Sequence, residues 1–301
     1  MIIWLVLFLL LAAGLPAVGL AIDPGRVQGS LQVHGRAVSL THAYAHLHDN
    51  TEGLLAYPQA LRLLFVDREV PPEALTGISL RLLGQLAREG RVQGLLLCLD
   101  PNNQRRFTVT LLYPPATPGG SFLTQRGGRS GRQPRLELQL SSSNRVGVAV
   151  ASQAVGGADP DKLPDLQYAL RGSAPLFHEM PVTAVLVGQK ARQSPQMELL
   201  RDLAAALARG AFASVERLTT AANQGTWTSL AQKGPAAGYV AKQAAAQLEE
   251  ARQSLQKVVV RGERAVAICA GRQWFSFMRQ GGAWRLDDHG DGTVSCAAPS
   301  P

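Results

Sequence analysis

The sequence predicts an α+β protein, in which an antiparallel β-sandwich or open barrel with one helix is followed by helices and an antiparallel meander. Residues 27–180 contain many short stretches in which apolar and polar residues alternate, as expected for strands with one buried face. After Ser194 the apolar residues recur at helical spacing instead. From residue 257 on, glycines separate four short runs typical of strands, and helices beside such a meander form an α+β unit.

The first part is predicted to be a succession of strands with one covering helix. The stretch 27–48 is expected to be a hairpin that turns at Gly35-Arg36. The two prolines that open the stretch 71–90 favour a helix start and its last glycine a helix stop, so this stretch is expected to be helical. The Gly- and Arg-rich stretch 114–134 lacks the pattern of a phosphate-binding loop and is expected to be a long loop, as is 156–165. Further strands are predicted at 60–67, 91–100, 105–113, 134–142, 144–152 and 166–172.

The second part is predicted to begin with a helix capped by Ser194, with Pro195 as its first residue. A short helix is expected at 211–222 and a long one at 238–256. The apolar face of the long helix would consist of Val240, Ala244, Leu248, Ala251 and Leu255. The four strands that follow are separated by Gly262, Gly271 and Gly281-Gly282. We therefore expect an N-terminal export segment (1–21), a β-rich domain (22–185), an α+β domain (194–288) and a polar tail (289–301).

The first 21 residues form an apolar run that Gly14 and Pro16 interrupt. Gly19 and Ala21 supply small residues ahead of a cleavage point before Ile22, which predicts a signal peptide. A retained anchor is the alternative, although the interruption leaves fewer than ~20 continuous apolar residues to cross a bilayer. We expect a periplasmic or secreted protein that touches a membrane only if this segment is retained.

The formal net charge of the chain is +8. A basic surface can bind nucleic acid, anionic lipid or an acidic wall polymer. The sequence contains no block of Lys and Arg interleaved with aromatic residues, so no nucleic-acid partner is expected. An unknown envelope protein or an acidic polymer is the expected partner.

The three cysteines do not have the spacing of a zinc or redox site. Cys269 and Cys296 lie in the same C-terminal region and could form a disulfide, whereas Cys98 is expected to be a small buried thiol. The sequence has no G-x-S-x-G motif, and His289 lies in a stretch expected to be a solvated tail. These observations leave the question of enzymatic activity open but favour a protein that is not an enzyme, and no cofactor is expected.

Residues 41–50, "THAYAHLHDN", contain three of the six histidines. On a strand, alternate residues of this stretch share one face, which we interpret as the solvent-exposed face of a half-buried strand. Only His46 and His48 are close enough to bind the same metal ion, and a third ligand would have to be Asp49 or His178. Zinc catalysis needs three protein ligands, so a metal site at this pair is the weaker alternative.

The stretches "LLRDLAAALARGAFASVERLTTA" (199–221) and "VVVRGERAVAI…WFSFMRQGGAWRLD" (258–287) resemble the cystatin-like α+β domains of the nuclear transport factor 2-like superfamily. The resemblance covers about the last third of the chain. It implies a curved sheet around a pocket, in a superfamily that includes enzymes, ligand binders and assembly domains. The first part, with "VHGRAVSLTHAYA", resembles uncharacterised exported bacterial proteins.

By this resemblance, Asp202 and Tyr239 are the candidates for polar groups in a pocket, and Trp274 and Trp284 for its lining. A fold of this kind does not by itself decide the function. We expect a non-catalytic binding or assembly module of the bacterial envelope. The alternatives are a small-ligand binder or an enzyme that uses the C-terminal pocket and, more weakly, a metal protein through His46 and His48.

Overall fold

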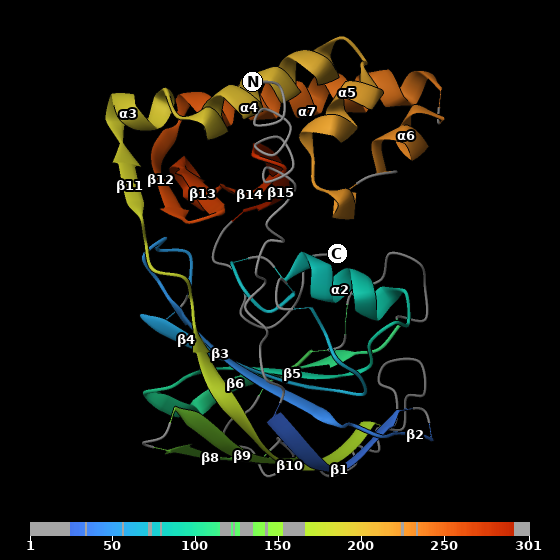
Figure 1. Ribbon diagram of the computed structural model, residues 1–301. Coiled ribbons are helices and arrows are strands. Elements are labelled where there is room, and N and C mark those ends of the chain that lie inside the picture. Colours follow the sequence, from blue (N-terminus) through green and yellow to red (C-terminus); the bar gives the residue numbers. More distant parts are fainter. Residues whose placement is uncertain are drawn as a thin grey trace, which may run out of the picture.

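The chain folds into two antiparallel sheets and a layer of helices (Figure 1). The computed structural model describes residues 25–33, 35–55, 57–71, 74–78, 80–114, 122, 124–126, 135–141, 144–152, 166–223, 226–232 and 234–291. The expected export segment, most of the two expected long loops and the end of the chain from residue 292, including Cys296, lie outside the described residues.

The first sheet has ten strands in the order β7-β6-β5-β4-β3-β1-β10-β9-β8, with β2 paired to β1. Because β3 pairs with both β1 and β10, the sheet bends there and its halves face each other across one core. The predicted hairpin is confirmed, since Val33 pairs with Arg36. The strands are β1 (Gly25–Val33), β2 (Arg36–Val38), β3 (His42–Asp49), β4 (Gln59–Val66), β5 (Gly94–Asp100), β6 (Asn103–Leu112), β7 (Thr124–Arg126), β8 (Arg135–Ser141), β9 (Arg145–Ser152) and β10 (Leu166–His178).

The second sheet has five strands in the order β11-β12-β13-β14-β15. Helices cover the face of this sheet that points away from the first sheet (Figure 1). The strands are β11 (Ala184–Val187), β12 (Leu255–Arg261), β13 (Arg264–Cys269), β14 (Trp274–Gln280) and β15 (Ala283–Gly290). The helices of this unit are α3 (Gly188–Arg192), α4 (Pro195–Ala208), α5 (Phe212–Leu218), α6 (Thr226–Ala231) and α7 (Pro235–Gln253), with short 3-10 turns at Ala221–Asn223 and Ala270–Arg272.

The half-sheet formed by β3, β4, β5 and β6 is buried on both of its faces. One face contributes Leu63 and Leu97, among others, to the core between the two halves of the first sheet. The other face carries Leu64 and Leu96, which pack under helix α2 (Arg81–Arg88). A strand that is buried on both sides needs apolar residues at successive positions, which explains the continuous apolar runs in β4 and β5.

The apolar centre of the contact between the two sheets consists of buried side chains from both of them. Leu54 and Ile78 come from the β-rich part, whereas Val259, Ile268 and Trp274 lie on the second sheet's face opposite to its helices. Relative motion between two units is the default unless their interface is substantial and apolar. The buried cluster therefore holds the second sheet in one position on the first.

Three predicted boundaries were wrong. Helix α2 begins at residue 81 rather than in the stretch 71–80, because the backbone around Gly77 has a positive φ of 82° and cannot be helical. Strand β11 crosses the expected end of the β-rich domain at residue 185 and pairs with β12 in the second sheet. Strand β15 continues to residue 290, so His289, expected in a solvated tail, is paired with Phe275 and its ring stacks on that phenyl ring.

The four-stranded meander was predicted correctly, and of the predicted apolar face of the long helix only Val240 is wrong, since Leu248 and Ala251 are buried and Ala244 and Leu255 pack against the core. Strands β12 to β15 occupy the expected stretch, and Gly262, Gly271 and Gly281 have positive φ at its turns. In α7, Ala241 and Ala245 complete the buried face, while Val240 is exposed. In the described part of the chain, no helix is both long and apolar enough to cross a membrane.

Candidate functional site

His46 and His48 lie in the contact between the two sheets and not on a solvent-exposed face, so that interpretation was wrong. Each has a relative exposure of 1%. They are on the face of β3 opposite to the apolar core, and in the sheet His46 lies directly across from Arg62 of β4. The alternation in "THAYAHLHDN" was read correctly as a two-faced strand, but both faces are covered.

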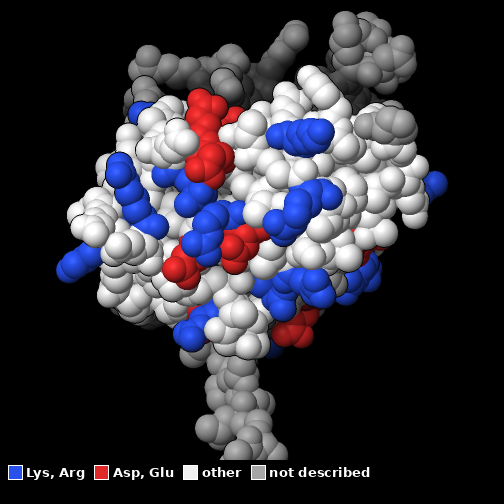
Figure 2. All heavy atoms as spheres, turned by 90° about the horizontal axis from the view of Figure 1, so that it is seen from above, with Lys and Arg blue, Asp and Glu red and all other residues white. Residues whose placement is uncertain are grey.

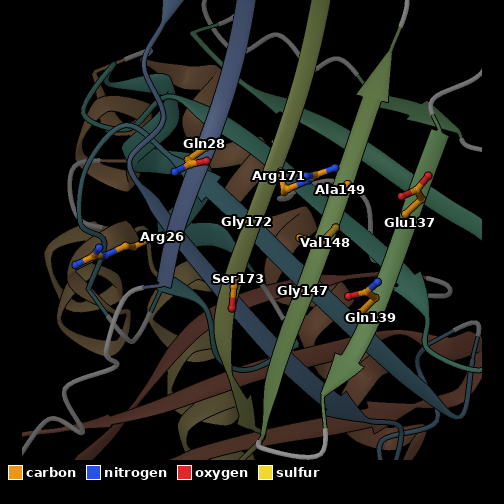
Figure 3. Close-up of a pocket in the computed structure, with 10 residues that line it drawn as sticks. All are labelled: Arg26, Gln28, Glu137, Gln139, Gly147, Val148, Ala149, Arg171, Gly172 and Ser173. Carbon is orange, nitrogen blue, oxygen red and sulfur yellow. The ribbon is translucent and has the colours of Figure 1, made fainter.

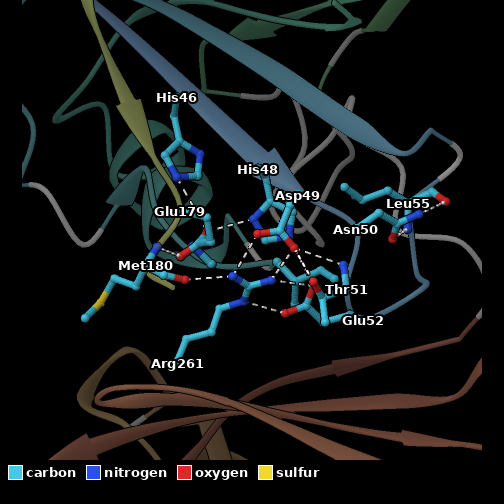
Figure 4. A network of polar contacts seen from close by, with 12 residues as sticks. His46, His48, Asp49, Asn50, Thr51, Glu52, Leu55, Glu179, Met180 and Arg261 are labelled. Carbon is cyan, nitrogen blue, oxygen red and sulfur yellow. Dashed lines mark hydrogen bonds and ion pairs between the residues drawn. The ribbon is translucent and has the colours of Figure 1, made fainter. Parts of the chain in front are cut away.

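Glu179, which follows β10, is the centre of the hydrogen bonds around these histidines (Figure 4). Its Oε2 lies 2.7 Å from Nδ1 of His48 and 3.5 Å from Nε2 of His46, and it accepts a hydrogen bond from the backbone N–H of Gly77 at 2.9 Å. Its Oε1 accepts a hydrogen bond from the N–H of Met180 at 3.2 Å. Burial alone would raise the pKa of Glu179, but the His48 hydrogen bond, the nearby imidazoles and the Gly77 N–H outweigh it and lower the pKa well below its usual range. Glu179 is therefore an ionised, fully hydrogen-bonded carboxylate.

Arg261 of β12 connects the second sheet to two carboxylates of the β-rich part. Its Nε donates to Glu52 at 2.8 Å, and its two terminal nitrogens donate to the two oxygens of Asp49. One of them also donates to the carbonyl of Met180 at 2.7 Å. Burial opposes the charge of Glu52, but the His48 imidazole 3.7 Å away and the hydrogen bonds from Arg261 still lower its pKa. The pKa of Arg261 is raised despite burial, because both carboxylates bind it. Bidentate contacts of this kind fix geometry as well as charge.

Two further arginines hold the segment 74–78 between the sheets. Arg62 of β4, which is buried, donates to the backbone carbonyls of Gly77 and Ile78. Arg264 of β13 donates to the carbonyl of Thr76 at 2.9 Å. Burial lowers the pKa of Arg62 to about 10, so it remains positively charged at neutral pH.

The arginines and carboxylates of the network balance one another, since Arg62, Arg261 and Arg264 face Asp49, Glu52 and Glu179. Burial also lowers the pKa of His46 to about 3, so this imidazole is neutral at physiological pH. A buried set of charges that already sums to zero would become positive if it bound a cation. Within the described residues, no three His, Cys, Asp or Glu side chains are arranged to hold a metal ion.

The cavity inside this network is too small for a substrate. Its volume is about 20 Å³, and His48, Glu52, Glu179 and Arg261 are among the residues that line it. That is space for about one water molecule. The histidines therefore belong to a structural contact between the sheets, which we call the interdomain network (His46, His48, Asp49, Glu52, Arg62, Glu179, Arg261 and Arg264).

The four residues proposed from sequence for a C-terminal pocket do not meet. Tyr239 is 72% exposed on α7, and the side chain of Asp202 is 57% exposed on α4, where it pairs with the neighbouring Arg201. Trp274 is buried against the β-rich part, whereas Trp284 packs on the helix-facing side of the sheet. That side is filled by core residues of the helices, among them Leu200 and Leu203 of α4.

The predicted Cys269–Cys296 disulfide is not formed, because Cys269 is a buried free thiol. Burial raises the pKa of this thiol to about 11, against a hydrogen bond with Ser254 that lowers it. Cys98, expected to be a free thiol, is in a disulfide. Cys296 lies outside the described residues.

An open hollow lies on the outer face of the first sheet, at the end of the molecule away from the helices (Figures 1 and 3). It has a volume of about 580 Å³, and an overlapping hollow of about 490 Å³ extends it along β9. Side chains alternate along each strand, so one set of residues points to the core and the other to this face. The outward residues form three rows across the strands β1, β10, β9 and β8. The first row is Arg26, Ser173, Gly147 and Gln139, and the second is Gln28, Arg171, Ala149 and Glu137. The third row crosses β1, β10 and β9 and consists of Ser30, Ala169 and Ala151.

The hollow exists because the outward residues of β9 are small. Gly147, Ala149 and Ala151 leave a floor of backbone, while longer polar side chains rise from β8 on one side and from β10 and β1 on the other. We call this hollow, with its walls of Arg26, Gln28, Glu137, Gln139 and Arg171, the β9 trough. The floor is part of a regular ladder of paired strands, so the walls are held at fixed positions.

Neither the β9 trough nor the interdomain network was recognised in the sequence, although both had signals there. "NRVGVAVAS" alternates valines with glycine and alanines, which was used only to predict a strand. The small residues at every second position also predict a smooth outer face. Of the network residues, only His46, His48 and Asp49 come from one stretch; the others are spread between residues 52 and 264, and no local pattern connects them to it.

Comparisons with known proteins add no further assignment, since no family model, curated protein or solved structure matches this chain.

Proposed function

We propose that this protein is an exported, non-catalytic binding module of the bacterial cell envelope, and that it binds its partner in the β9 trough. The observation that carries this proposal is an open hollow of about 580 Å³ whose floor and walls belong to paired strands. Sites built on strands hold their side chains more precisely than sites on loops. The chemistry that the trough offers is guanidinium, amide and carboxylate groups that face solvent.

The charged groups in the contact between the sheets have a different role in this proposal. The interdomain network is largely buried and encloses a cavity of only about 20 Å³, so it supports a fixed arrangement and not turnover of a substrate. The helical unit would then be an attached domain that is held in one orientation relative to the trough.

We further propose that the C-terminal unit is related to the cystatin-like domains of the nuclear transport factor 2-like superfamily. The support is the order of its elements, in which helices precede an antiparallel meander and cover one of its faces. The superfamily includes assembly domains, and we assign this role to the unit here because core side chains fill the space between its helices and its sheet. A ligand bound among α4, α7 and the sheet would contradict this assignment.

The proposal is tested by sedimenting the purified mature protein with cell envelopes isolated from its own source. Ala149→Trp fills the trough from its floor with a side chain that strands accept well. The matched control, Gln243→Trp, adds the same side chain to the exposed surface of α7. We expect the unchanged protein and the control to sediment with the envelope, and the trough variant to lose about tenfold or more in affinity, a difference of roughly 1.4 kcal/mol.

Two results would contradict the proposal. The first is equal sedimentation of the Ala149→Trp variant and the unchanged protein, which would place the binding surface elsewhere. The second is chemical change of the bound material, measured by mass spectrometry after incubation, which would indicate an enzyme. A small organic ligand that stays bound to both tryptophan variants in native mass spectrometry would favour a pocket in the C-terminal unit instead.

A further inference from the structure

Three arginines lie at successive rows of the outer face of the first sheet: Arg26 and Arg171 line the β9 trough, and Arg145 lies one row beyond its end. Arg145 begins β9, Arg26 lies one row further on β1, and Arg171 follows in the next row on β10. Outward-facing rows of a sheet are two residues apart, which corresponds to a spacing of roughly 6.6 Å along the strands. The three arginines therefore start from successive rows of three neighbouring strands, β9, β1 and β10.

These arginines are free to bind an anion. In the described part of the chain none of the three forms an ion pair, and the one polar partner of Arg145 is Ser173, whose hydroxyl and carbonyl it contacts at 3.3 and 3.5 Å.

Exposed arginines of the helical unit are arranged differently. Arg201, Arg252 and Arg279 each have a carboxylate partner, respectively Asp202, Glu249 and Glu263. Figure 2 shows acidic groups lying among the basic ones near the centre of this helical face. Other exposed arginines in the described part of the helical unit, such as Arg192 and Arg209, also have no ion pair. What distinguishes Arg26 and Arg171 is that they line a hollow whose floor is made of paired strands.

One carboxylate, Glu137, lies in the same row as Arg171, on the other side of the floor, and Ala149 lies between them. It places negative charge on the β8 wall and positive charge on the β10 and β1 wall. An anionic chain would therefore be held against the arginine wall. None of the described residues that line the trough is aromatic, so it offers no stacking platform for bases of a single-stranded nucleic acid.

We propose that the β9 trough binds a linear, non-nucleic polyanion in an extended form, with Arg145, Arg26 and Arg171 each contacting one anionic group. This inference rests on the proposed function and specifies its ligand. Carboxylate and phosphate groups both fit a guanidinium fork, so the shared chemistry is a repeated anionic group along an open-ended chain. An extended ligand can lie along the floor because the two overlapping hollows are continuous in the strand direction.

The test measures binding of fluorescently labelled polygalacturonate and of labelled long-chain polyphosphate to the mature protein by anisotropy over a range of salt concentrations. The key variant carries Arg26→Gln, Arg145→Gln and Arg171→Gln. Its matched control, with Arg201→Gln, Arg209→Gln and Arg279→Gln, loses the same charge from the helical unit. The neutral polymer dextran and an oligo-dT strand serve as comparison ligands.

We expect the trough triple variant to bind the preferred polyanion about tenfold more weakly or worse, from three exposed charge contacts of roughly 0.2–1 kcal/mol each. The control triple variant should bind within about twofold of the unchanged protein, as distant surface charges are screened. The logarithm of the unchanged protein's affinity should fall with the logarithm of salt concentration with a slope of roughly −2 to −3, and the trough triple variant should lose most of this slope. Preference for one polymer identifies carboxylate or phosphate as the anionic group.

Glu137→Gln provides a change in the opposite direction. Removing the only carboxylate among the described trough residues should strengthen polyanion binding by about two- to fivefold, because an exposed like charge is lost. A loss of binding in this variant would overturn the inference and indicate a ligand with a cationic group.

The inference is also overturned if the two triple variants bind the polyanions equally, or if oligo-dT binds more tightly than both polymers in an arginine-dependent way. These results differ from failure of the proposed function. If Ala149→Trp abolishes envelope binding while the trough arginine variant retains it, the trough is the binding site but its ligand is not a polyanion.

Discussion

Replacing Arg261 by Met tests whether the interdomain network holds the two sheets together in solution. The substitution keeps an unbranched apolar stem but removes the hydrogen bonds of the guanidinium group to Asp49, Glu52 and Met180. Asp49 has a side chain that is 41% exposed and regains water, whereas the side chain of Glu52 is 1% exposed and stays buried without its cation. The cost of the substitution therefore falls mainly on Glu52.

Removing one partner of a buried ion pair destabilises a protein by about 3–5 kcal/mol. Because Asp49 is partly solvated, we expect Arg261→Met to lower the free energy of unfolding by roughly 3 kcal/mol, at the lower end of this range. Adding Glu52→Gln removes the unpaired charge, so the double variant should recover about half of the loss, with a coupling free energy of roughly 1–3 kcal/mol.

The measurement is urea unfolding at pH 7, followed by tryptophan fluorescence and by far-ultraviolet circular dichroism. Trp274 lies in the contact between the sheets and reports on it directly. The unchanged protein should unfold in one transition by both probes, whereas Arg261→Met should shift the fluorescence transition to lower urea. A loss below about 1 kcal/mol, with no recovery in the double variant, would refute a buried and fully paired Arg261.

Two further substitution experiments and one labelling experiment follow from the structure. The pKa of His46 is about 3 in the folded protein against 6.5 in the unfolded chain, so its contribution to stability is complete above pH 6.5 and is lost as the pH falls towards 3, by up to roughly 5 kcal/mol. His46→Leu should therefore reduce the loss of unfolding free energy between pH 6.5 and 3, whereas the control His42→Leu should leave it unchanged. Gly77→Ala should destabilise by more than Gly53→Ala, since both glycines have positive φ but an added methyl at Gly77 alone meets a neighbouring guanidinium; thermal unfolding of the two variants gives the difference, and equal losses would contradict it. The thiol of Cys269 should react with iodoacetamide only after unfolding, as peptide mass spectrometry can show; labelling of the native protein would place it outside the core.

The parts of the fold that could be predicted are those specified by local pattern. In the C-terminal meander, each strand alternates and each turn contains a glycine with positive φ, as at Gly262 and Gly271. The start of α4 at Pro195 was predicted for the same reason, since a proline fixes the backbone of a first helical turn. Such signals act over a few residues and need no information about the rest of the chain.

The parts that could not be predicted depend on which surfaces meet. The alternation of β3 shows that His46 and Ala45 lie on opposite faces, but it does not show that a second sheet covers the imidazole face. Likewise, the start of α2 depends on Arg62 and Arg264, which hold the preceding backbone from opposite sides. Arg264, which is 188 residues from Thr76 in the sequence, carries no local sign of this contact.

The distribution of charge over the interdomain network explains why the two sheets are found together. The β-rich part contributes Asp49, Glu52, Glu179 and Arg62 and so has an excess of negative charge, whereas Arg261 and Arg264 make the facing surface of the second sheet positive. Either surface alone would expose charged groups without partners, and their charges balance only when the two sheets meet in this register. An apolar contact of the same size could be as stable or more so, but it would tolerate sliding, whereas directional hydrogen bonds to fixed carboxylates do not. The orientation of the helical unit relative to the β9 trough is thus specified by charge, and it should be lost before either sheet unfolds when that charge balance is disturbed.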